Sequence, residues 1–322
     1  MDILPHIRNA LQELKFARSA ADLWILFKKA SYLLPRILGS LERVSQIPPS
    51  LQIEPTNNCN LRCICCSTSR SGRKKGCMDM ALYQRIANEA ASIGVKRFHL
   101  YLHGEPFLHP EILNMVASAK RHGIAVHLTT NGMLMDRAKL ERLLDSGVTC
   151  ADHVIFSLLG QTRETHEKIM RRVDHNQVVN NIHALLELRK TKRVNGPIVE
   201  TILYKMPENE HEEEAFFTYW RRFVDHVRIV GRVSKSFSDF GSETVRVPVR
   251  TRTCSNLWER MTIFWNGDVT LCCNDVGGDH VLGNLSDSTI SEIWNGTKLE
   301  AVRRLHRSRQ LQKIPFCYRC DM

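Results

Sequence analysis

The chain has 322 residues and carries 45 lysines and arginines against 34 aspartates and glutamates, a formal net charge of +11 at pH 7. Its hydrophobic content of 43% is that of a globular protein large enough for one main domain and a small appended one. No apolar run is long enough to span a bilayer, and residues 1–5 lack the basic start and unbroken apolar stretch of a signal peptide. The basic charge would suit nucleic acid, but no nucleic-acid-binding motif accompanies it, so we expect no such partner. The eleven cysteines are clustered, which favours metal sites in a reducing compartment over disulfides, and we expect a cytoplasmic protein.

Residues 1–50 are predicted to form an N-terminal helical segment, with helices at 6–16, 20–32 and 34–44. The stretch from Trp24 to Lys29 is both apolar and basic, which permits two interpretations. The helices could contact an anionic membrane surface or a lipid-linked substrate. Alternatively, they could form a layer packed under the main domain, and we favour this second interpretation.

Three cysteines follow the first predicted strand, at residues 51–55. Cys59, Cys63 and Cys66 have the spacing C-x3-C-x2-C. Three thiolates on one loop can hold three irons of a [4Fe–4S] cluster and leave the fourth iron open to a small molecule. The alternatives are a zinc site or redox thiols, although zinc sites usually show paired C-x2-C units.

This loop resembles that of the radical S-adenosylmethionine (SAM) enzymes. The resemblance implies that the open iron takes the amino and carboxylate groups of SAM. An electron from the reduced cluster then cleaves SAM to methionine and a 5′-deoxyadenosyl radical, which abstracts a hydrogen atom from the substrate. Cys65 is a departure, because relatives often have a bulky residue there whose backbone meets the adenine. Its thiol could compete for iron or pack as a small hydrophobic group, and we favour packing.

A strand predicted at 96–102 leads into the next match. His103-Gly104-Glu105-Pro106 resembles the Gly-Gly-Glu-Pro segment of the family, with His103 in place of the first glycine. The resemblance implies that the backbone at this strand end and Glu105 hold the ammonium group of SAM. A carboxylate next to an ammonium group forms a charge-assisted hydrogen bond.

Two further strand ends and one arginine complete the resemblance. Thr130 and Asn131 follow a strand predicted at 124–129, and Ser157 lies near the end of a strand at 152–158. In relatives, polar groups at these strand ends approach the ribose and methionine parts of SAM. Arg171 matches a position where relatives keep an arginine near the SAM carboxylate, which suits a guanidinium fork. The alternative for Arg171 is a solvated charge at a helix end.

Strand and helix patterns alternate through residues 51–235, which we assign to one domain. Strands are predicted at 51–55, 96–102, 124–129, 152–158, 198–204 and 226–230, and helices at 79–93, 110–122, 136–146, 177–191 and 209–224. This alternation indicates an α/β fold with a parallel sheet and crossover helices. It matches the partial (β/α)6 TIM-like barrel of the family. Ligands in such folds collect at the carboxyl ends of the strands, where the candidate residues fall.

A small C-terminal domain is predicted at 236–322. Apolar runs at 261–265 and 268–272 flank Asn266-Gly267, a strong signal for a type I′ hairpin, and a helical stretch is expected from about 289 to 309. The cysteine pattern resembles the SPASM/twitch auxiliary-cluster domain in its short form, which implies one auxiliary [4Fe–4S] cluster. Its expected ligands are Cys254, Cys272, Cys317 and Cys320. Two alternatives stay open, namely Cys273 in place of Cys272 and a zinc ion held by four thiolates.

The family resemblance predicts a radical SAM enzyme, with a reductant such as flavodoxin or ferredoxin as partner. The basic run at 70–75 could steer an anionic substrate or could be a solvated face. We therefore expect a small substrate, such as a phosphorylated sugar, a nucleotide or a lipid-linked molecule, that is oxidised or rearranged. The alternatives are maturation of a peptide or protein side chain, of the RiPP or sulfatase-maturase type, and a non-catalytic iron–sulfur electron-transfer protein. Oxidation of a substrate radical needs a base, and the candidates are Asp275, Glu200 and Tyr204.

Overall fold

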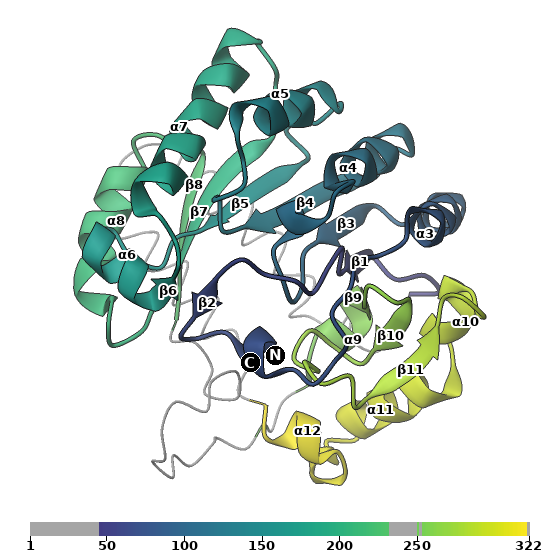
Figure 1. Ribbon diagram of the computed structural model, residues 1–322. Coiled ribbons are helices and arrows are strands. Elements are labelled where there is room, and N and C mark those ends of the chain that lie inside the picture. Colours follow the sequence, from purple (N-terminus) through teal and green to yellow (C-terminus); the bar gives the residue numbers. More distant parts are fainter. Residues whose placement is uncertain (1–44, 232–249, 251–252, 321–322) are drawn as a thin grey trace, which may run out of the picture.

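The computed structural model of the protein describes residues 45–231, 250 and 253–320 (Figure 1). The helices expected at 6–16, 20–32 and 34–44 lie outside the described residues. The strands are β1 (Ser50–Ile53), β2 (Arg62–Cys63), β3 (Arg97–Leu100), β4 (Ala125–Thr130), β5 (His153–Ser157), β6 (Met170–Arg171), β7 (Ile198–Tyr204), β8 (His226–Val230), β9 (Arg260–Ile263), β10 (Asp268–Thr270) and β11 (Val281–Asn284). The α-helices are α3 (Met80–Ile93), α4 (Ile112–Arg121), α5 (Arg137–Asp145), α6 (Arg163–Ile169), α7 (His175–Thr191), α8 (Glu213–Trp220), α9 (Asn256–Glu259), α10 (Ile290–Trp294), α11 (Thr297–Arg307) and α12 (Pro315–Tyr318).

One nine-stranded sheet organises the described chain. Its strand order is β11-β10-β9-β1-β3-β4-β5-β7-β8, and the strands from β1 to β8 in this order pair in parallel. Helices α3, α4, α5, α7 and α8 cover its outer side (Figure 1). The six strands and crossover helices predicted from the sequence are therefore confirmed, in an α/β fold with a parallel sheet.

The helices begin where short polar side chains cap their free backbone amides. Asp79 accepts hydrogen bonds from the amides of Ala81 and Leu82 at the start of α3, at 2.8 and 3.3 Å. Asp136 and Asp174 cap α5 and α7 in the same way. Such a cap is worth about 1 kcal/mol, because the first turn of a helix has no internal partners for these groups.

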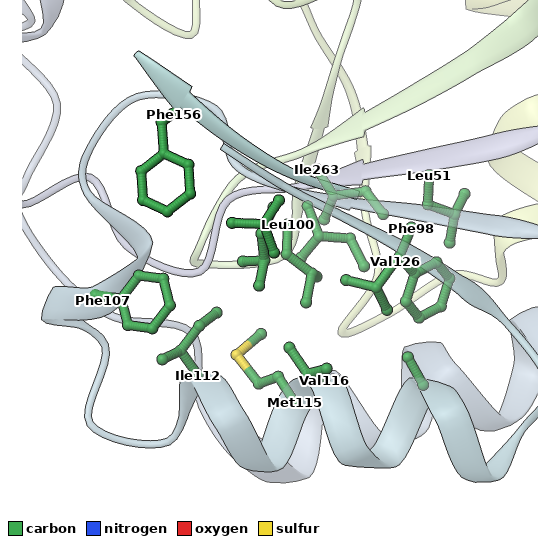
Figure 2. Packing of buried hydrophobic residues seen from close by; sticks show 14 of the residues in the cluster. Leu51, Phe98, Leu100, Phe107, Ile112, Met115, Val116, Val126, Phe156 and Ile263 are labelled. Carbon is green, nitrogen blue, oxygen red and sulfur yellow. The ribbon is translucent and has the colours of Figure 1, made fainter. Parts of the chain in front are cut away.

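The hydrophobic core lies between the sheet and its helices (Figure 2). Leu51, Phe98 and Val126 come from neighbouring strands and face Met115 and Val116 of α4. All five side chains are buried, and a core methylene group removed from water contributes about 0.8 kcal/mol. Buried and partly exposed residues alternate along β4. His127 and Thr129 point to the inner face of the sheet, away from the helices, and are partly exposed.

The C-terminal hairpin joins this sheet directly. Strand β9 pairs in parallel with β1, with Ser50 opposite Arg260 and Ile53 opposite Ile263. Ile263 consequently packs in the same core as Leu51 (Figure 2). The hairpin was predicted to belong to a small C-terminal domain, and no local pattern indicated its pairing with β1.

The hairpin turn differs in type from the expectation. The amide of Gly267 donates to the carbonyl of Phe264 at 2.9 Å, so Trp265 and Asn266 are the central residues of the turn. Only Gly267 has a positive φ, of 89°. This is the geometry of a three-residue loop that ends in a glycine bulge, and the expected type I′ turn would need a positive φ at Asn266 as well.

Two predicted helices are shorter than expected. The stretch expected from about 289 to 309 is divided into α10 and α11, and a capping box of Thr289 and Glu292 begins α10. The helix expected at 209–224 starts with a 3-10 turn at Glu210–Glu212 before α8. None of the described helices combines the length and hydropathy needed for a membrane crossing.

Candidate functional site

The loop between β1 and η1 (Ser67–Arg70) carries the three cysteines of the C-x3-C-x2-C motif. Cys63 lies on β2, which pairs with β6 so that Cys63 stands opposite Met170. The amide of Ile64 donates to the carbonyl of Ile169 at 2.9 Å. The loop is thus attached to the segment that follows α6, at the carboxyl edge of the parallel sheet.

The thiols of this loop form a group in which each affects its neighbours. Burial raises the pKa of Cys59 to about 11, and it also raises the pKa of Cys63, where the charges of Cys59, Cys65 and Cys66 add to the effect. Cys66 is exposed. Metal binding and thiol deprotonation are coupled, so a bound metal would favour the thiolate forms of Cys59 and Cys63 despite their burial. The donor set therefore fits an iron–sulfur cluster.

The cysteine side chains of this loop do not surround a common metal position in this structure. Within residues 45–231 and 253–320, no three His, Cys, Asp or Glu side chains are gathered closely enough to hold a metal ion. Cys65 packs against the hydrophobic core, and burial raises the pKa of its thiol to about 12. Cys59 and Cys63 also pack against this core, so the choice between packing and iron binding for Cys65 stays a prediction.

Glu105 connects the ends of β3 and β4. Its carboxylate accepts hydrogen bonds from the hydroxyl of Thr130 at 2.7 Å, the amide of Asn131 at 2.7 Å and the amide of Phe107 at 3.1 Å. Burial raises the pKa of this carboxyl group to about 7, although the three hydrogen bonds oppose the shift. Asn131 in turn donates to the side chain of Asn60 at 2.9 Å, which brings the cysteine loop into the same network.

The backbone of the His103–Pro106 segment lies against the cysteine loop. The amide of Glu105 donates to the carbonyl of Asn58 at 2.8 Å. Gly104 has a φ of 144°, and a Cβ atom there would lie 2.4 Å from the carbonyl oxygen of Thr56. Only glycine permits this approach, since the three nearest atoms, from Thr56, Asn57 and Asn58, all belong to the backbone.

Gly104→Ala is expected to push the two segments apart and to lower the iron bound after anaerobic reconstitution, because a Cβ there overlaps rigid backbone. Iron and SAM binding are the measurements. Gly72→Ala is the matched control, since its Cβ would meet nothing within 4 Å, and it should leave both values unchanged. Full iron and normal SAM binding in Gly104→Ala would show that the close approach is dispensable.

The remaining SAM candidates lie along the same edge. Ser157 ends β5, partly exposed and in register with Ile202 of β7. Arg171 is exposed on β6, opposite Arg62 of the cysteine loop. The structure therefore places Arg171 next to the loop, while its role toward the SAM carboxylate stays a prediction. Pro106 begins the short helix η2 (Pro106–Leu108), which Glu105 caps.

The C-terminal cysteines also lie near one another. Burial raises the pKa of Cys317 to about 12, with the charges of Cys254 and Cys320 as further causes, and it raises the pKa of Cys272, near Cys254 and Cys317. Asn274 donates to the sulfur of Cys320 at 3.4 Å. Cys273 also lies within electrostatic range of Cys254 and Cys320, so the choice between Cys272 and Cys273 as ligand stays open.

The three candidates for a catalytic base have different surroundings. Asp275 is buried and accepts from the hydroxyl of Thr270 and from the amides of Asp279 and His280, both at 2.9 Å. These contacts organise the loop after Cys272 and occupy its carboxylate. Glu200 pairs with Arg228 at 2.5 Å on the inner face of the sheet. Tyr204 ends β7 and is the most exposed of the three, at 37%.

A buried ionic cluster, which the sequence did not predict, lies between the two cysteine regions. Arg73 forms two hydrogen bonds to Glu54, at 2.7 and 2.9 Å, and its guanidinium lies 3.7 Å over the ring of Phe264. The Nε2 of His103 donates to the carbonyl of Cys273 at 3.0 Å, and Arg73 Nε donates to the carbonyl of Val276. The cluster therefore connects the end of β1, the segment before Glu105 and the auxiliary cysteine loop. The only signal in the sequence was a histidine where relatives have glycine.

Comparison with known families agrees with this geometry. The model of the radical SAM superfamily matches residues 53–219, and that of the SPASM iron–sulfur cluster-binding domain matches residues 254–321. The chain belongs to the radical SAM superfamily. It is accordingly an enzyme whose cofactors are SAM and [4Fe–4S] clusters.

Among curated proteins, the chain is similar to PqqA peptide cyclase of Gluconobacter oxydans, at 26% identity over 77% of this chain and 76% of that protein. It is 36% identical to PqqA peptide cyclase of Methylorubrum populi, over 38% of this chain and 31% of that protein. It is also 33% identical to GTP 3′,8-cyclase of Chlorobaculum tepidum, over 45% of this chain and 43% of that protein. The second and third matches thus span less than half of those relatives.

Solved structures share the fold. SuiB of Streptococcus suis bound to the precursor peptide SuiA has a TM-score of 0.65 at 16% identity, covering 88% of this chain and 71% of that one. BtrN in complex with AdoMet and 2-DOIA has a TM-score of 0.57 at 18% identity, covering 86% of this chain and 94% of that one.

Proposed function

We propose that this enzyme modifies a side chain of a peptide or protein by hydrogen-atom abstraction, as in the maturation of peptide natural products. The observation that carries the proposal is the similarity to PqqA peptide cyclase, which extends over 77% of the chain and 76% of that protein. The shared fold with SuiB bound to its precursor peptide supports it. The small anionic substrate expected from the sequence is less well supported than this alternative.

The chain itself would perform three tasks in such a reaction. Cys59, Cys63 and Cys66 would hold the first cluster, which when bound and reduced supplies the electron that cleaves SAM. Glu105 would hold the backbone around the SAM amino group in place through Thr130 and Asn131. Within the C-terminal region, Cys254, Cys317 and Cys320, with Cys272 or Cys273, would hold an auxiliary cluster with four thiolate ligands, closed to substrate.

Reconstituted and reduced enzyme should convert a short peptide substrate when SAM is supplied under anaerobic conditions. Mass spectrometry would follow the loss of hydrogen from the peptide, and 5′-deoxyadenosine would be counted in the same samples. We expect one 5′-deoxyadenosine for each peptide modified, if SAM is consumed in each turnover. The same peptide without SAM is the control.

A second candidate is oxidation of a small molecule, which the match to BtrN favours because it covers 94% of that chain. The same assay distinguishes a peptide substrate from a small-molecule substrate. Release of 5′-deoxyadenosine that is stimulated by sugar phosphates or polyols, with every tested peptide unchanged, would reject the peptide proposal in favour of a small-molecule oxidation.

A further inference from the structure

A row of polar side chains crosses the inner face of the parallel sheet, opposite the face that the helices cover. Gln52, His99, His127 and His153 stand in register on β1, β3, β4 and β5. The ring centroids of His99 and His127 are 5.1 Å apart, and those of His127 and His153 are 4.3 Å apart. We call these four residues the inner-face row.

Arginines stand next to this row. Arg97 and Arg260 occupy equivalent positions on β3 and β9, both opposite Ser50 of β1. Three described carboxylates near the row have basic neighbours, namely Glu54 with Arg73, Glu200 with Arg228 and Asp152 with Lys120. The positive charges of Arg97 and Arg260 are among the causes that lower the pKa of His127 to about 3, after burial and His153. The inner face is therefore a region of positive potential.

Several polar atoms of this region have no hydrogen-bond partner among the described residues. They are both ring nitrogens of His99, Nε2 of His127, Oε1 of Gln52, and Nε of Arg97 and Arg260. A buried polar atom without a partner costs about 1–3 kcal/mol, and native proteins keep few of them. His99 and Gln52 are 4% and 3% exposed, so hydrogen bonds to bulk water do not offset this cost.

Part of the inner face is nevertheless exposed to solvent. Arg97, His127 and His153 are partly exposed, whereas the alternate residues of their strands are buried under the helices. The row also lies below the candidate SAM site on the same strands. Thr130 lies three positions after His127 on β4, or about 10 Å along an extended strand. A substrate could hold one group at the row and present another to the SAM site.

We propose that the inner-face row, together with Arg97 and Arg260, binds a carboxylate of the substrate. Neutral imidazoles and guanidinium groups supply the donors that a carboxylate needs, and arginine matches its two oxygens. The two arginines beside the row repel a cation, so this region suits an anion better than a metal ion. The inference rests on the proposed function, since an acidic side chain or the C-terminus of a peptide supplies this group.

The test measures binding of small probes to the reconstituted, SAM-loaded enzyme by saturation-transfer NMR. N-acetyl-glutamate α-amide carries a side-chain carboxylate, N-acetyl-glutamine an α-carboxylate, and N-acetyl-glutamine amide no charge. We expect at least one charged probe to bind about tenfold more tightly than the neutral one, the worth of one charge-assisted hydrogen bond. The charged probe that binds identifies the source of the carboxylate.

Two variants test whether the charged probe binds at the inner-face row and its arginines. Arg97→Gln should weaken the charged probe about tenfold and leave the neutral probe unchanged. His127→Phe keeps a planar ring while removing its nitrogens, and it tests the same point if Arg97→Gln does not fold. His183→Phe is the matched control, because this histidine stacks on Trp220 on the outer side of the sheet. It should bind all probes as the parent does.

The outcomes separate this inference from the proposed function. Equal binding of charged and neutral probes, or charged-probe binding that neither row variant weakens, overturns the carboxylate site. Binding of inorganic phosphate in preference to both carboxylates overturns the ligand class. Carboxylate binding that the variants weaken, in an enzyme that modifies no peptide, supports the site and rejects the peptide proposal alone.

Discussion

Replacing Cys63 with alanine is expected to remove one entire cluster and, with it, all cleavage of SAM. Cys63 is held on β2 by pairing with β6, so no neighbouring thiol reaches its position without breaking that pairing. A cluster held by three thiolates does not persist with two, and the bound iron should fall by about four per chain. Iron and sulfide counts, low-temperature EPR and 5′-deoxyadenosine formation are the measurements.

Cys150→Ala is the matched control for this experiment. Cys150 is exposed in the turn before β5, and its loss should change neither iron nor SAM cleavage. Substituting Cys65 and Cys66 separately by alanine tests the ligand assignment in the same assay. Loss of iron is expected for Cys66→Ala and not for Cys65→Ala. The reverse result would show that Cys65, and not Cys66, is the third ligand. Full iron in Cys63→Ala would contradict the three-thiolate site.

Glu54→Gln is expected to destabilise the protein by about 3–5 kcal/mol, because it leaves the Arg73 guanidinium buried without its partner. The side chain of Glu54 is 0% exposed and that of Arg73 is 11% exposed. The same carboxylate accepts from the amide of Trp265 at 3.2 Å, so the substitution also loosens the hairpin. Urea unfolding of the reconstituted enzyme measures the change in the free energy of unfolding.

Glu141→Gln supplies the comparison, since Glu141 pairs with Arg137 on the surface of α5, where a pair contributes less than about 1 kcal/mol.

The pH dependence of stability gives a second measurement. Burial alone would raise the pKa of Glu54, but hydrogen bonds from His103 and Arg73 outweigh it and hold the pKa below its usual value of 4.5. The folded protein therefore loses this stabilisation as the pH falls below that value, and Glu54→Gln should lack that loss. Similar stability of the two glutamine variants would show that the buried pair contributes little.

The parallel sheet and the positions of the cysteines could be predicted because local patterns determine them. Strand periodicity, helix caps and the cysteine spacing all act over a few residues. Thr130 and Ser157 could be placed at one edge for the same reason, since the carboxyl ends of parallel strands lie together. These patterns did not predict the similarity to a peptide cyclase, because substrate choice depends on side chains that lie outside the motifs.

Features that depend on distant segments could not be predicted. Arg73 belongs to a run of basic residues that looks solvated in the sequence, and only the fold brings it to Glu54 and Phe264. Pairing of β9 with β1 is likewise invisible locally, because both strands have ordinary apolar patterns. The turn at Gly267 was assigned to the wrong type because Asn-Gly also suits a three-residue loop when Trp265 takes the first position.

The pairing of β9 with β1 has a consequence for the order in which the chain is made. During synthesis, β1 emerges early and gains β3 as a neighbour, but its other edge stays open until Arg260 has left the ribosome. An unpaired strand edge is a template for association with other chains. Contacts this far apart in sequence also slow folding. A chain ending after β8 would therefore leave open one edge of the strand that leads into the first cluster loop.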